Sequence, residues 1–274
     1  MNSPDRYAVV GWPVAHSRSP QIHTLFAQQT GQALVYEAIA VEPENFPARV
    51  HDFFTTGGRG LNITVPHKQA AHRLSASLTE RARLAGAVNT LWPDAAGSLR
   101  GDNTDGAGLV RDLIHNLHWT LRARRVLLLG AGGAARGALA PLLALQPTRV
   151  VIANRTTARA MELADRFSQL GPVSGCGMEA IEPAPFDVII NATSAGVAGE
   201  IARLPDRAVA AHTHCYDMAY GKSETAFTRW ARERGAEAAE MGLGMLVEQA
   251  AEAFELWRGV RPATAPVLSV LRAA

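Results

Sequence analysis

A glycine-rich turn between a strand pattern and a helix pattern constrains the fold of this chain more than any other feature. Residues 127–129 are three leucines, as in a buried strand, and the turn Gly-Ala-Gly-Gly-Ala-Ala follows at 130–135. An Ala- and Leu-rich helical pattern then runs to about Leu145. This order is the fingerprint of a dinucleotide-binding βαβ unit with alanine at its third small position.

Each small residue of the turn has a physical purpose. Gly130 allows the tight turn, Gly132 lets the backbone approach a pyrophosphate, and Ala135 permits close packing of the helix on the strand. The amide groups at the helix N-terminus then meet the phosphates. A turn that only packs a helix on a strand is the alternative, but the neighbouring elements favour a dinucleotide. The expected cofactor contacts are Gly130, Ala131, Gly132, Gly133 and Ala134.

The end of the next strand distinguishes the two nicotinamide cofactors. An NAD-binding chain usually has Asp or Glu there for the ribose hydroxyls, whereas this chain has Asn154, Arg155 and Thr156. A guanidinium can bind a 2′-phosphate bidentately and stack on the adenine, so the sequence predicts NADP rather than NAD. The alternative is that Arg155 is an exposed loop charge only.

The strand and helix patterns predict an α/β protein of two domains. The first hundred residues alternate between short strand patterns and amphipathic helices, including a helix capped at Ser19 and a capping box at 77–80. From Gly106 a helix is expected to lead to Arg125, followed by a doubly wound unit with strands at 126–129, 150–153, 187–191 and 214–218. After Gly244 the chain is helical and is expected to return to the first domain.

These patterns give the expected domain bounds. A mainly parallel α/β substrate-binding domain comprises residues 1–104 and is completed by the C-terminal helices at 243–274. A Rossmann-type, doubly wound NADP-binding domain comprises residues 105–242.

Composition excludes several other classes of protein. The formal net charge of +2 is too small, and the basic residues too scattered, for nucleic-acid binding. No segment has the pattern of a signal peptide or a membrane span, and the only two cysteines, Cys176 and Cys215, have no redox or metal spacing. His16 and His23 lack a third ligand nearby, so no metal is expected. A cytoplasmic protein, monomeric or homodimeric, is the expectation.

A second group of polar residues lies in the first domain. Along 62–65 the residues alternate, which places Asn62 and Thr64 on one strand face. Pro66 ends the strand, so Lys68 emerges at its carboxyl end, where open α/β sheets bind ligands. The polar run 101–106 falls at the expected junction of the two domains and is predicted to line a cleft there.

From end to end, the sequence resembles the shikimate dehydrogenase family. Besides the glycine turn, the matching motifs are HSRSP at 16–20, NITVPHK at 62–68, GAVNT at 86–90, GDNTDG at 101–106, NRT at 154–156, NATS at 191–194, YDM at 216–218 and GLGM at 242–245. The resemblance implies NADP-linked interconversion of shikimate and 3-dehydroshikimate, a step of aromatic amino-acid biosynthesis.

The resemblance also implies residue roles. Ser17 and Ser19 would bind the substrate carboxylate, Thr64, Asn89 and Gln249 would hold the ring substituents, and Lys68 and Asp105 would form the catalytic pair. Ketone reduction builds alkoxide charge that a positioned ammonium can stabilise and protonate, and a carboxylate can orient that ammonium. Tyr220 would line the cleft near nicotinamide or substrate, unless it is simply packed. Met218 and Gly242 are further expected cofactor contacts.

Two alternatives remain open at this point. A quinate/shikimate dehydrogenase that uses NAD is the nearest, although Arg155 argues against NAD and Ser19 against quinate. The other is a noncatalytic, regulatory NADP-binding relative, which need not retain Lys68 and Asp105.

Overall fold

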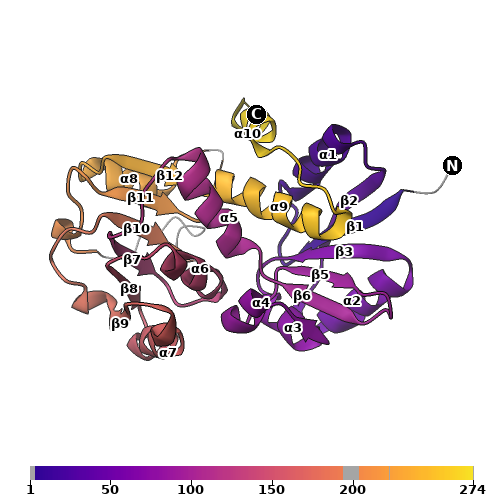
Figure 1. Ribbon diagram of the computed structural model, residues 1–274, viewed down its shortest axis with the longest axis horizontal. Helices are drawn as coiled ribbons and strands as arrows, with labels where there is room; N and C mark the ends of the chain where they lie inside the picture. Colours follow the sequence, from indigo (N-terminus) through magenta and orange to yellow (C-terminus); the bar gives the residue numbers. More distant parts are fainter. Residues whose placement is uncertain (1–3, 194–203, 222, 274) are drawn as a thin grey trace. The chain divides into compact units, whose positions relative to one another are not determined.

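The computed structural model describes residues 4–193, 204–221 and 223–273 of the chain. These residues form two compact units (Figure 1). The first unit comprises Met1–Gly108 and Leu246–Ala274, and the second comprises Leu109–Met245. The bounds expected from the sequence, 104/105 and 242/243, lie a few residues before these divisions.

The first unit is built on a mixed six-stranded sheet with the order β2-β1-β3-β5-β6-β4. Its strands are β1 (Asp5–Gly11), β2 (Leu34–Ala40), β3 (Gly58–Ile63), β4 (Ser77–Leu78), β5 (Thr90–Pro93) and β6 (Leu99–Asp102). Strand β1 is parallel to both β2 and β3, and β4 is parallel to β6. Only β5 runs antiparallel to its neighbours, so the expected mainly parallel character is confirmed.

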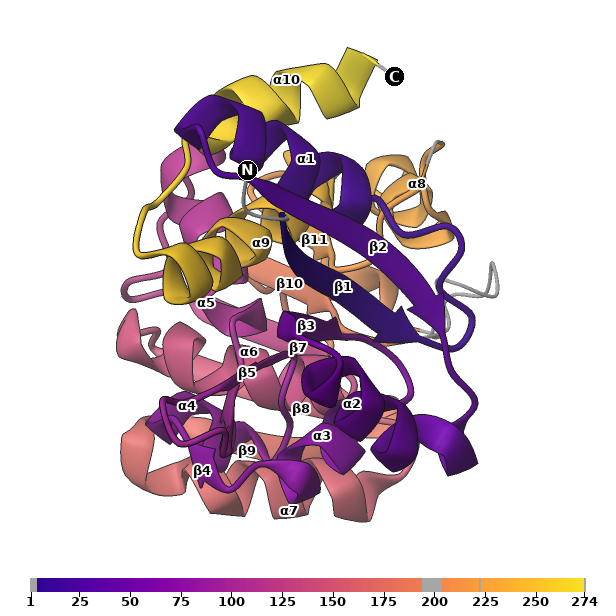
Figure 2. The same cartoon turned by 90° about the vertical axis from the view of Figure 1, so that its right-hand side faces the viewer.

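Helices cover both faces of this sheet. They are α1 (Ser19–Thr30), α2 (Phe46–Thr55), α3 (Lys68–Leu74), α4 (Glu80–Ala85) and α10 (Thr264–Ala273), together with the larger part of α9 (Leu243–Arg258) and the 3-10 turn η1 (Pro43–Asn45). Alternate residues of β1 separate the two cores: Ala8 and Val10 pack with Phe46 of α2, whereas Tyr7 and Val9 pack toward Trp257 of α9. Helices α1 and α10 lie side by side (Figure 2).

Two predicted helix caps in this unit are wrong. Ser19 is the first residue of α1 rather than its cap, and Arg18 at the N-cap position makes no side-chain capping bond. Ser77 lies in strand β4, and Thr79 caps α4 instead by accepting a hydrogen bond from the Ala82 amide. The Thr79 cap satisfies one of the free amides at the helix start, which is the role that the sequence had given to Ser77.

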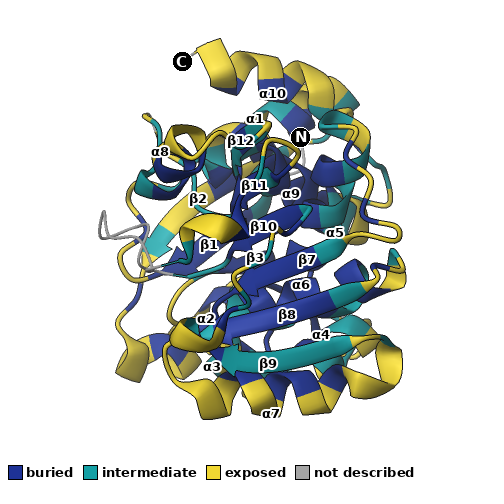
Figure 3. Ribbon diagram, turned by 90° about the vertical axis from the view of Figure 1, so that its left-hand side faces the viewer, coloured by how far each residue is buried: buried dark blue, intermediate teal, exposed yellow. Residues whose placement is uncertain are grey.

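The second unit contains a fully parallel sheet with the order β12-β11-β10-β7-β8-β9. Its strands are β7 (Arg125–Leu129), β8 (Arg149–Asn154), β9 (Val173–Gly177), β10 (Val188–Asn191), β11 (His214–Asp217) and β12 (Ala238–Met241). Strand order reverses between β7 and β10, as in a Rossmann-type unit, so the predicted fold class is confirmed. The central strands β7 and β8 are buried along most of their length, whereas the edge strand β9 is half-buried (Figure 3).

The edge strands β9 and β12 were not predicted from the sequence. Strand β9 contains two glycines within five residues, and β12 has the sequence Ala-Ala-Glu-Met, so neither has a strong strand propensity. The helices of this unit are α6 (Gly133–Ala144), α7 (Thr157–Phe167) and α8 (Ala226–Glu233). Short turns are η3 (Ser168–Leu170), η4 (Met178–Ala180) and η6 (Asp206–Ala208).

The prediction of one long helix from Gly106 to Arg125 is also wrong. Helix α5 (Asp105–Arg111) continues only as one π-helical turn, η2 (Asp112–Asn116). His118 and Ala123 then adopt left-handed backbone angles, with φ of 56° and 59°, which a helix cannot contain. The π-helical turn places Asp112 where the buried Tyr216 hydroxyl donates to its carboxylate at 2.5 Å.

Candidate active site

Lys68 and Asp105 form an ion pair inside the first unit. The Lys68 Nζ lies 2.6 Å from Asp105 Oδ2, and the two side chains are 18% and 8% exposed. Strand β3 ends at Ile63, and the turn that follows is closed by the His67 amide donating to the Thr64 carbonyl at 3.0 Å. Helix α3 then begins at Lys68, while Asp105 is the first residue of α5. Asp105 therefore belongs to the same unit as Lys68, although the sequence assigned it to the start of the second domain.

Asn89 connects this pair to the rest of the site. Its Nδ2 donates to Asp105 Oδ1 at 2.9 Å and to Thr104 Oγ1 at 2.9 Å, and lies 3.3 Å from Gln249 Oε1. Its Oδ1 accepts from the Thr104 amide at 2.8 Å and from Thr90 Oγ1 at 2.9 Å. Four of the residues expected from the resemblance thus share one hydrogen-bonded group, Lys68, Asp105, Asn89 and Gln249.

The loop that carries Asp105 is fixed by a buried carboxylate. Asp102, 1% exposed, accepts two bonds from the Arg81 guanidinium, at 2.7 and 2.5 Å, and one from the Asn103 amide at 2.7 Å. Asn103 in turn accepts from the Asp105 amide at 3.2 Å. Because bidentate charge-assisted bonds are strong and directional, Arg81 holds the start of α5 in place. Sequence reasoning missed Arg81, since the neighbouring residues 77–80 gave only a capping signal.

Ser17, Ser19 and Thr64 lie after the carboxyl ends of β1 and β3. Ser17 Oγ accepts from the Ser19 amide at 3.3 Å, and Ser19 is only 5% exposed. The Thr64 amide donates to the Val10 carbonyl at 2.9 Å, which keeps Thr64 beside β1. Gly11 makes this close approach possible, because a Cβ there would lie 2.4 Å from Thr64 Cγ2. Ligands bind at this edge in open α/β sheets.

In the second unit, the glycine turn has a geometry that fits a dinucleotide. Gly130 has φ of 103°, and an added Cβ would lie 3.1 Å from the Ala192 carbonyl, so the tight turn requires glycine. Gly132 has ordinary angles, and a Cβ there would meet no atom within 4 Å. Packing therefore does not explain the glycine at 132, whereas a pyrophosphate above the start of α6 would.

The Asn154–Thr156 segment begins with the last residue of β8, at the same edge of the sheet. Asn154 Nδ2 donates to the Thr156 carbonyl at 3.0 Å and closes the turn before α7. Arg155 is exposed and makes no hydrogen bond or ion pair with any residue that the structure describes. Arg159, also exposed, lies within the first turn of α7 and was not singled out from the sequence. Arg155 precedes the Thr156 N-cap, so no helical spacing in the sequence linked the two residues.

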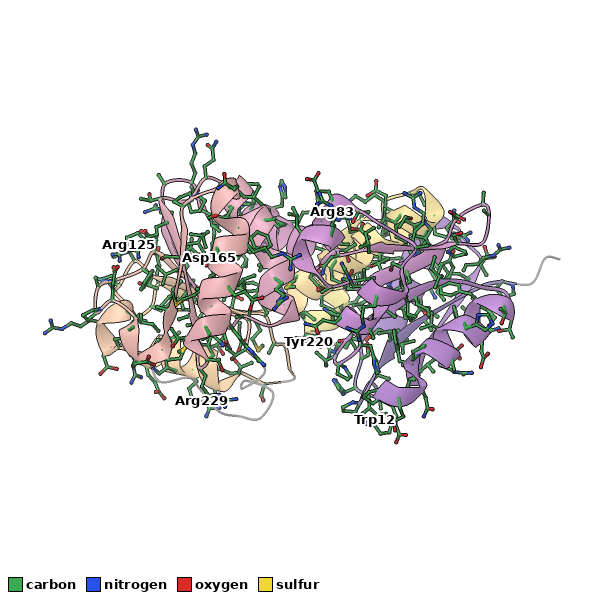
Figure 4. All side chains as sticks on the ribbon, turned by 90° about the horizontal axis from the view of Figure 1, so that it is seen from below. Trp12, Arg83, Arg125, Asp165, Tyr220 and Arg229 are labelled. Atoms are coloured by element: carbon green, nitrogen blue, oxygen red, sulfur yellow. The ribbon has the colours of Figure 1, made fainter. Side chains whose placement is uncertain are left out.

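Met218 and Gly242 lie together at the ends of β11 and β12. The Met218 amide donates to the Asn191 carbonyl at 2.9 Å, and a Cβ on Gly242 would lie 2.4 Å from the Met218 carbonyl oxygen. Tyr220 is half-buried shortly after β11 and is labelled in Figure 4. Of the predicted NATS motif at 191–194, Ser194 lies outside the described residues.

Two further observations concern metals and membranes. Within residues 4–193, 204–221 and 223–273, no three His, Cys, Asp or Glu side chains are grouped as metal ligands. No helix in the same ranges is both long enough and apolar enough to cross a membrane.

Three family models match the chain in order. The model described as the shikimate dehydrogenase substrate binding domain matches residues 9–91, the shikimate / quinate 5-dehydrogenase model matches 112–200, and the shikimate 5'-dehydrogenase C-terminal domain matches 242–272. A curated relative from Methylococcus capsulatus, named shikimate dehydrogenase (NADP(+)), is 55% identical over 100% of this chain and 98% of its own. The chain belongs to the shikimate dehydrogenase family.

Solved structures of similar fold agree with this architecture. An Ael1 enzyme from Pseudomonas putida is 47% identical, with a TM-score of 0.90 over 97% of this chain and 98% of that one. The shikimate 5-dehydrogenase of Thermus thermophilus, solved with NADP(H) and shikimate, is 32% identical with a TM-score of 0.87 over 98% and 99%. The resemblance read from the motifs is therefore confirmed at the level of the family and the fold.

Proposed function

We propose that this chain is an NADP-dependent shikimate dehydrogenase, an oxidoreductase that interconverts shikimate and 3-dehydroshikimate in aromatic amino-acid biosynthesis. The observation that carries the proposal is the Lys68–Asp105 ion pair at 2.6 Å, held within one hydrogen-bonded group with Asn89 and Gln249. A noncatalytic relative need not retain this arrangement. The curated relatives at 53–56% identity, named NADP(+) shikimate dehydrogenases, support the same substrate and cofactor.

In the proposed reaction, bound NADP supplies or accepts the hydride. Lys68 does the proton chemistry: its Nζ gives a proton to the oxygen of the ketone as that oxygen becomes an alkoxide, and takes the proton back in the direction of oxidation. Asp105 orients the ammonium through Oδ2 and balances its charge. Asn89 holds Asp105 by its other oxygen, so the direction of the Lys68 bond is fixed before substrate binds.

The remaining substrate contacts are assigned from the same geometry. Ser17 and Ser19 would bind the substrate carboxylate at the end of β1, and Thr64, Asn89 and Gln249 would bind ring hydroxyls. Tyr220 would contact the nicotinamide or the substrate. Residues 1–104 and 243–274 form the proposed substrate-binding domain, and residues 105–242 the NADP-binding domain. That the catalytic pair faces the nicotinamide across a gap between the domains stays a prediction.

The proposed NADP site lies at the carboxyl ends of the strands of the second sheet. Backbone amides from Gly130 to Ala134 would bind the pyrophosphate, and Met218 and Gly242 would contact the nicotinamide half. Arg155, with Asn154, Thr156 and Arg159, would bind the adenosine 2′-phosphate. Arg155 suits this role because it is exposed and pairs with none of the residues that the structure describes. We further propose a cytoplasmic enzyme, monomeric or homodimeric, with no nucleic-acid or membrane partner.

A spectrophotometric assay of the purified chain tests this function. The initial rate at which absorbance rises at the maximum of the reduced nicotinamide is compared for shikimate and quinate, each with NADP and with NAD. We expect turnover to be fastest with shikimate and NADP. Faster NAD-linked turnover of quinate would replace the proposal with a quinate dehydrogenase, and absence of turnover in every pairing would favour a noncatalytic relative.

A further inference from the structure

A row of polar side chains crosses one face of the first sheet. Tyr36 lies on β2, Asn62 on β3 and Thr90 on β5, within a face that is otherwise aromatic and aliphatic. Asn62 is in register with Val9 of β1 on one side and with Thr90 on the other. Because strand residues alternate between faces, Tyr36, Asn62 and Thr90 all point to the face that is covered by α1 and α9.

The Tyr36 hydroxyl is the first member of a buried series of hydrogen bonds. It donates to Asn62 Oδ1 at 2.7 Å, and Tyr36 is only 9% exposed. Burial raises the pKa of Tyr36 well above its usual value. The hydroxyl therefore stays protonated and donates to Asn62.

From Asn62 the hydrogen bonds continue to the catalytic pair. Its Nδ2 lies 3.3 Å from the Asn89 carbonyl and 3.3 Å from Thr90 Oγ1, and Thr90 donates to Asn89 Oδ1 at 2.9 Å. Asn89 then donates to Asp105, whose other oxygen accepts from Lys68. One buried chain of bonds thus runs from Tyr36 to Lys68, and networks of this kind fix their members cooperatively.

The position of the Tyr36 ring is set by packing. The His23 ring stacks on it, with centroids 4.1 Å apart and planes at 4°. His23 is 1% exposed, and neither of its ring nitrogens has a hydrogen-bond partner among the residues that the structure describes. His23 thus acts as a flat packing surface for Tyr36, beside Phe26, Phe254 and Trp257.

We propose that Tyr36 is a positioning residue for substrate, whose hydroxyl holds Asn62 and, through Asn62 and Thr90, the Asn89 side chain that contacts Asp105. A small ring acid that binds at Asn89 and places its reacting hydroxyl at Lys68 depends on the position of these side chains. The inference rests on the proposed function, because that function supplies such a ligand. Tyr36 itself touches neither the hydride nor the proton in the proposed reaction.

The variant Tyr36→Phe removes the hydroxyl and keeps the ring stacked on His23. Tyr7→Phe is the matched control, because Tyr7 is the register partner of Tyr36 on the same sheet face and is also buried. The Tyr7 hydroxyl, however, accepts from Arg258 and lies outside the chain of bonds from Tyr36 to Lys68. Both variants lose one buried hydroxyl, so a merely structural effect would appear in both.

For Tyr36→Phe we expect KM for shikimate and its Kd by calorimetry to rise about tenfold, with KM for NADP unchanged and kcat lowered less than KM is raised. For Tyr7→Phe we expect both shikimate constants to stay within about twofold. The same Tyr36→Phe change in an Asn62→Ala background should have little further effect on KM.

An unchanged shikimate KM and Kd in Tyr36→Phe, with a wild type that turns over shikimate, would overturn the inference alone. A wild type that neither binds nor turns over shikimate would overturn the proposed function, and the inference with it.

Discussion

Asn89 donates its side-chain amide to Asp105 Oδ1, the carboxylate oxygen that Lys68 does not contact. Asp105 is therefore held from both sides, by a neutral donor on one oxygen and by an ammonium on the other. Because Asn89 is itself fixed by Thr104 and Thr90, the carboxylate has little freedom to turn. The Lys68 ammonium consequently has one preferred direction, which is the property that proton transfer at a single atom requires.

Replacing Lys68 tests that assignment. We expect Lys68→Ala to lower kcat by about 10²–10⁴-fold, the usual range for a lost general acid, with the Kd for NADP nearly unchanged. Steady-state rates and a fluorescence titration with NADPH would measure the two quantities. Lys68→Arg is the informative companion, because a guanidinium keeps the positive charge but does not release a proton near neutral pH. Near-normal turnover in Lys68→Ala would remove Lys68 from the mechanism, and near-normal turnover in Lys68→Arg would limit its role to charge.

The glycine turn allows binding and folding to be separated. A Cβ at Gly132 would meet open space, so Gly132→Val should leave Tm within a few degrees while lowering NADP affinity at least about tenfold, since the pyrophosphate could no longer approach the backbone. Gly130→Ala is the contrasting control: with φ of 103° and the Ala192 carbonyl 3.1 Å away, it should lower Tm. Calorimetry with NADP and thermal denaturation give both readouts. Undiminished NADP affinity in Gly132→Val would contradict the assigned cofactor site.

Much of the fold could be read from the sequence because its signals are local. The continuous apolar run of β7 and the glycine turn after it predicted a buried parallel strand and a dinucleotide site, and the Asn62–Val65 alternation predicted the strand face on which Asn62 lies. The edge strands β9 and β12 escaped prediction because their residues have weak strand propensity, so pairing with a neighbouring strand decides their conformation.

The contacts made across long stretches of sequence could not be predicted in the same way. Arg81 binds Asp102, and Tyr36 binds Asn62, only because the sheet order brings β2, β3, β5 and β6 together. No spacing in the sequence signals such a pair. Asp105 could be named as a partner of Lys68 only through the resemblance, and its place in the first unit follows from the bond to Asn89 rather than from any local pattern.

The preference for NADP over NAD can be tested at Arg155. Loss of a charge-assisted contact to the 2′-phosphate should weaken NADP binding in Arg155→Ala by about 1.5–3 kcal/mol, with a much smaller effect on NAD. Arg122→Ala is the control, because Arg122 is also exposed but lies before the amino end of β7, whereas Gly130 follows its carboxyl end. Calorimetric titrations of both variants with both cofactors would measure the difference. Equal losses for NADP and NAD in Arg155→Ala would contradict the phosphate role.

Burial of His23 makes the stability of the fold depend on pH. Burial lowers the pKa of His23 from 6.5 to about 3, so between these pH values the unfolded chain binds a proton at this residue that the folded chain does not. The free energy of unfolding should therefore fall as the pH drops below 6.5, by about 2 kcal/mol at pH 5. Urea denaturation at pH 7.5 and pH 5 would measure this loss.

In His23→Phe, which keeps an aromatic ring on Tyr36, the loss between the two pH values should be smaller by that amount, whereas the exposed His51→Phe should behave like the wild type. If all three proteins lost the same stability on acidification, His23 would have to titrate in the folded state with its ordinary pKa, and its neutral packing against Tyr36 would be ruled out.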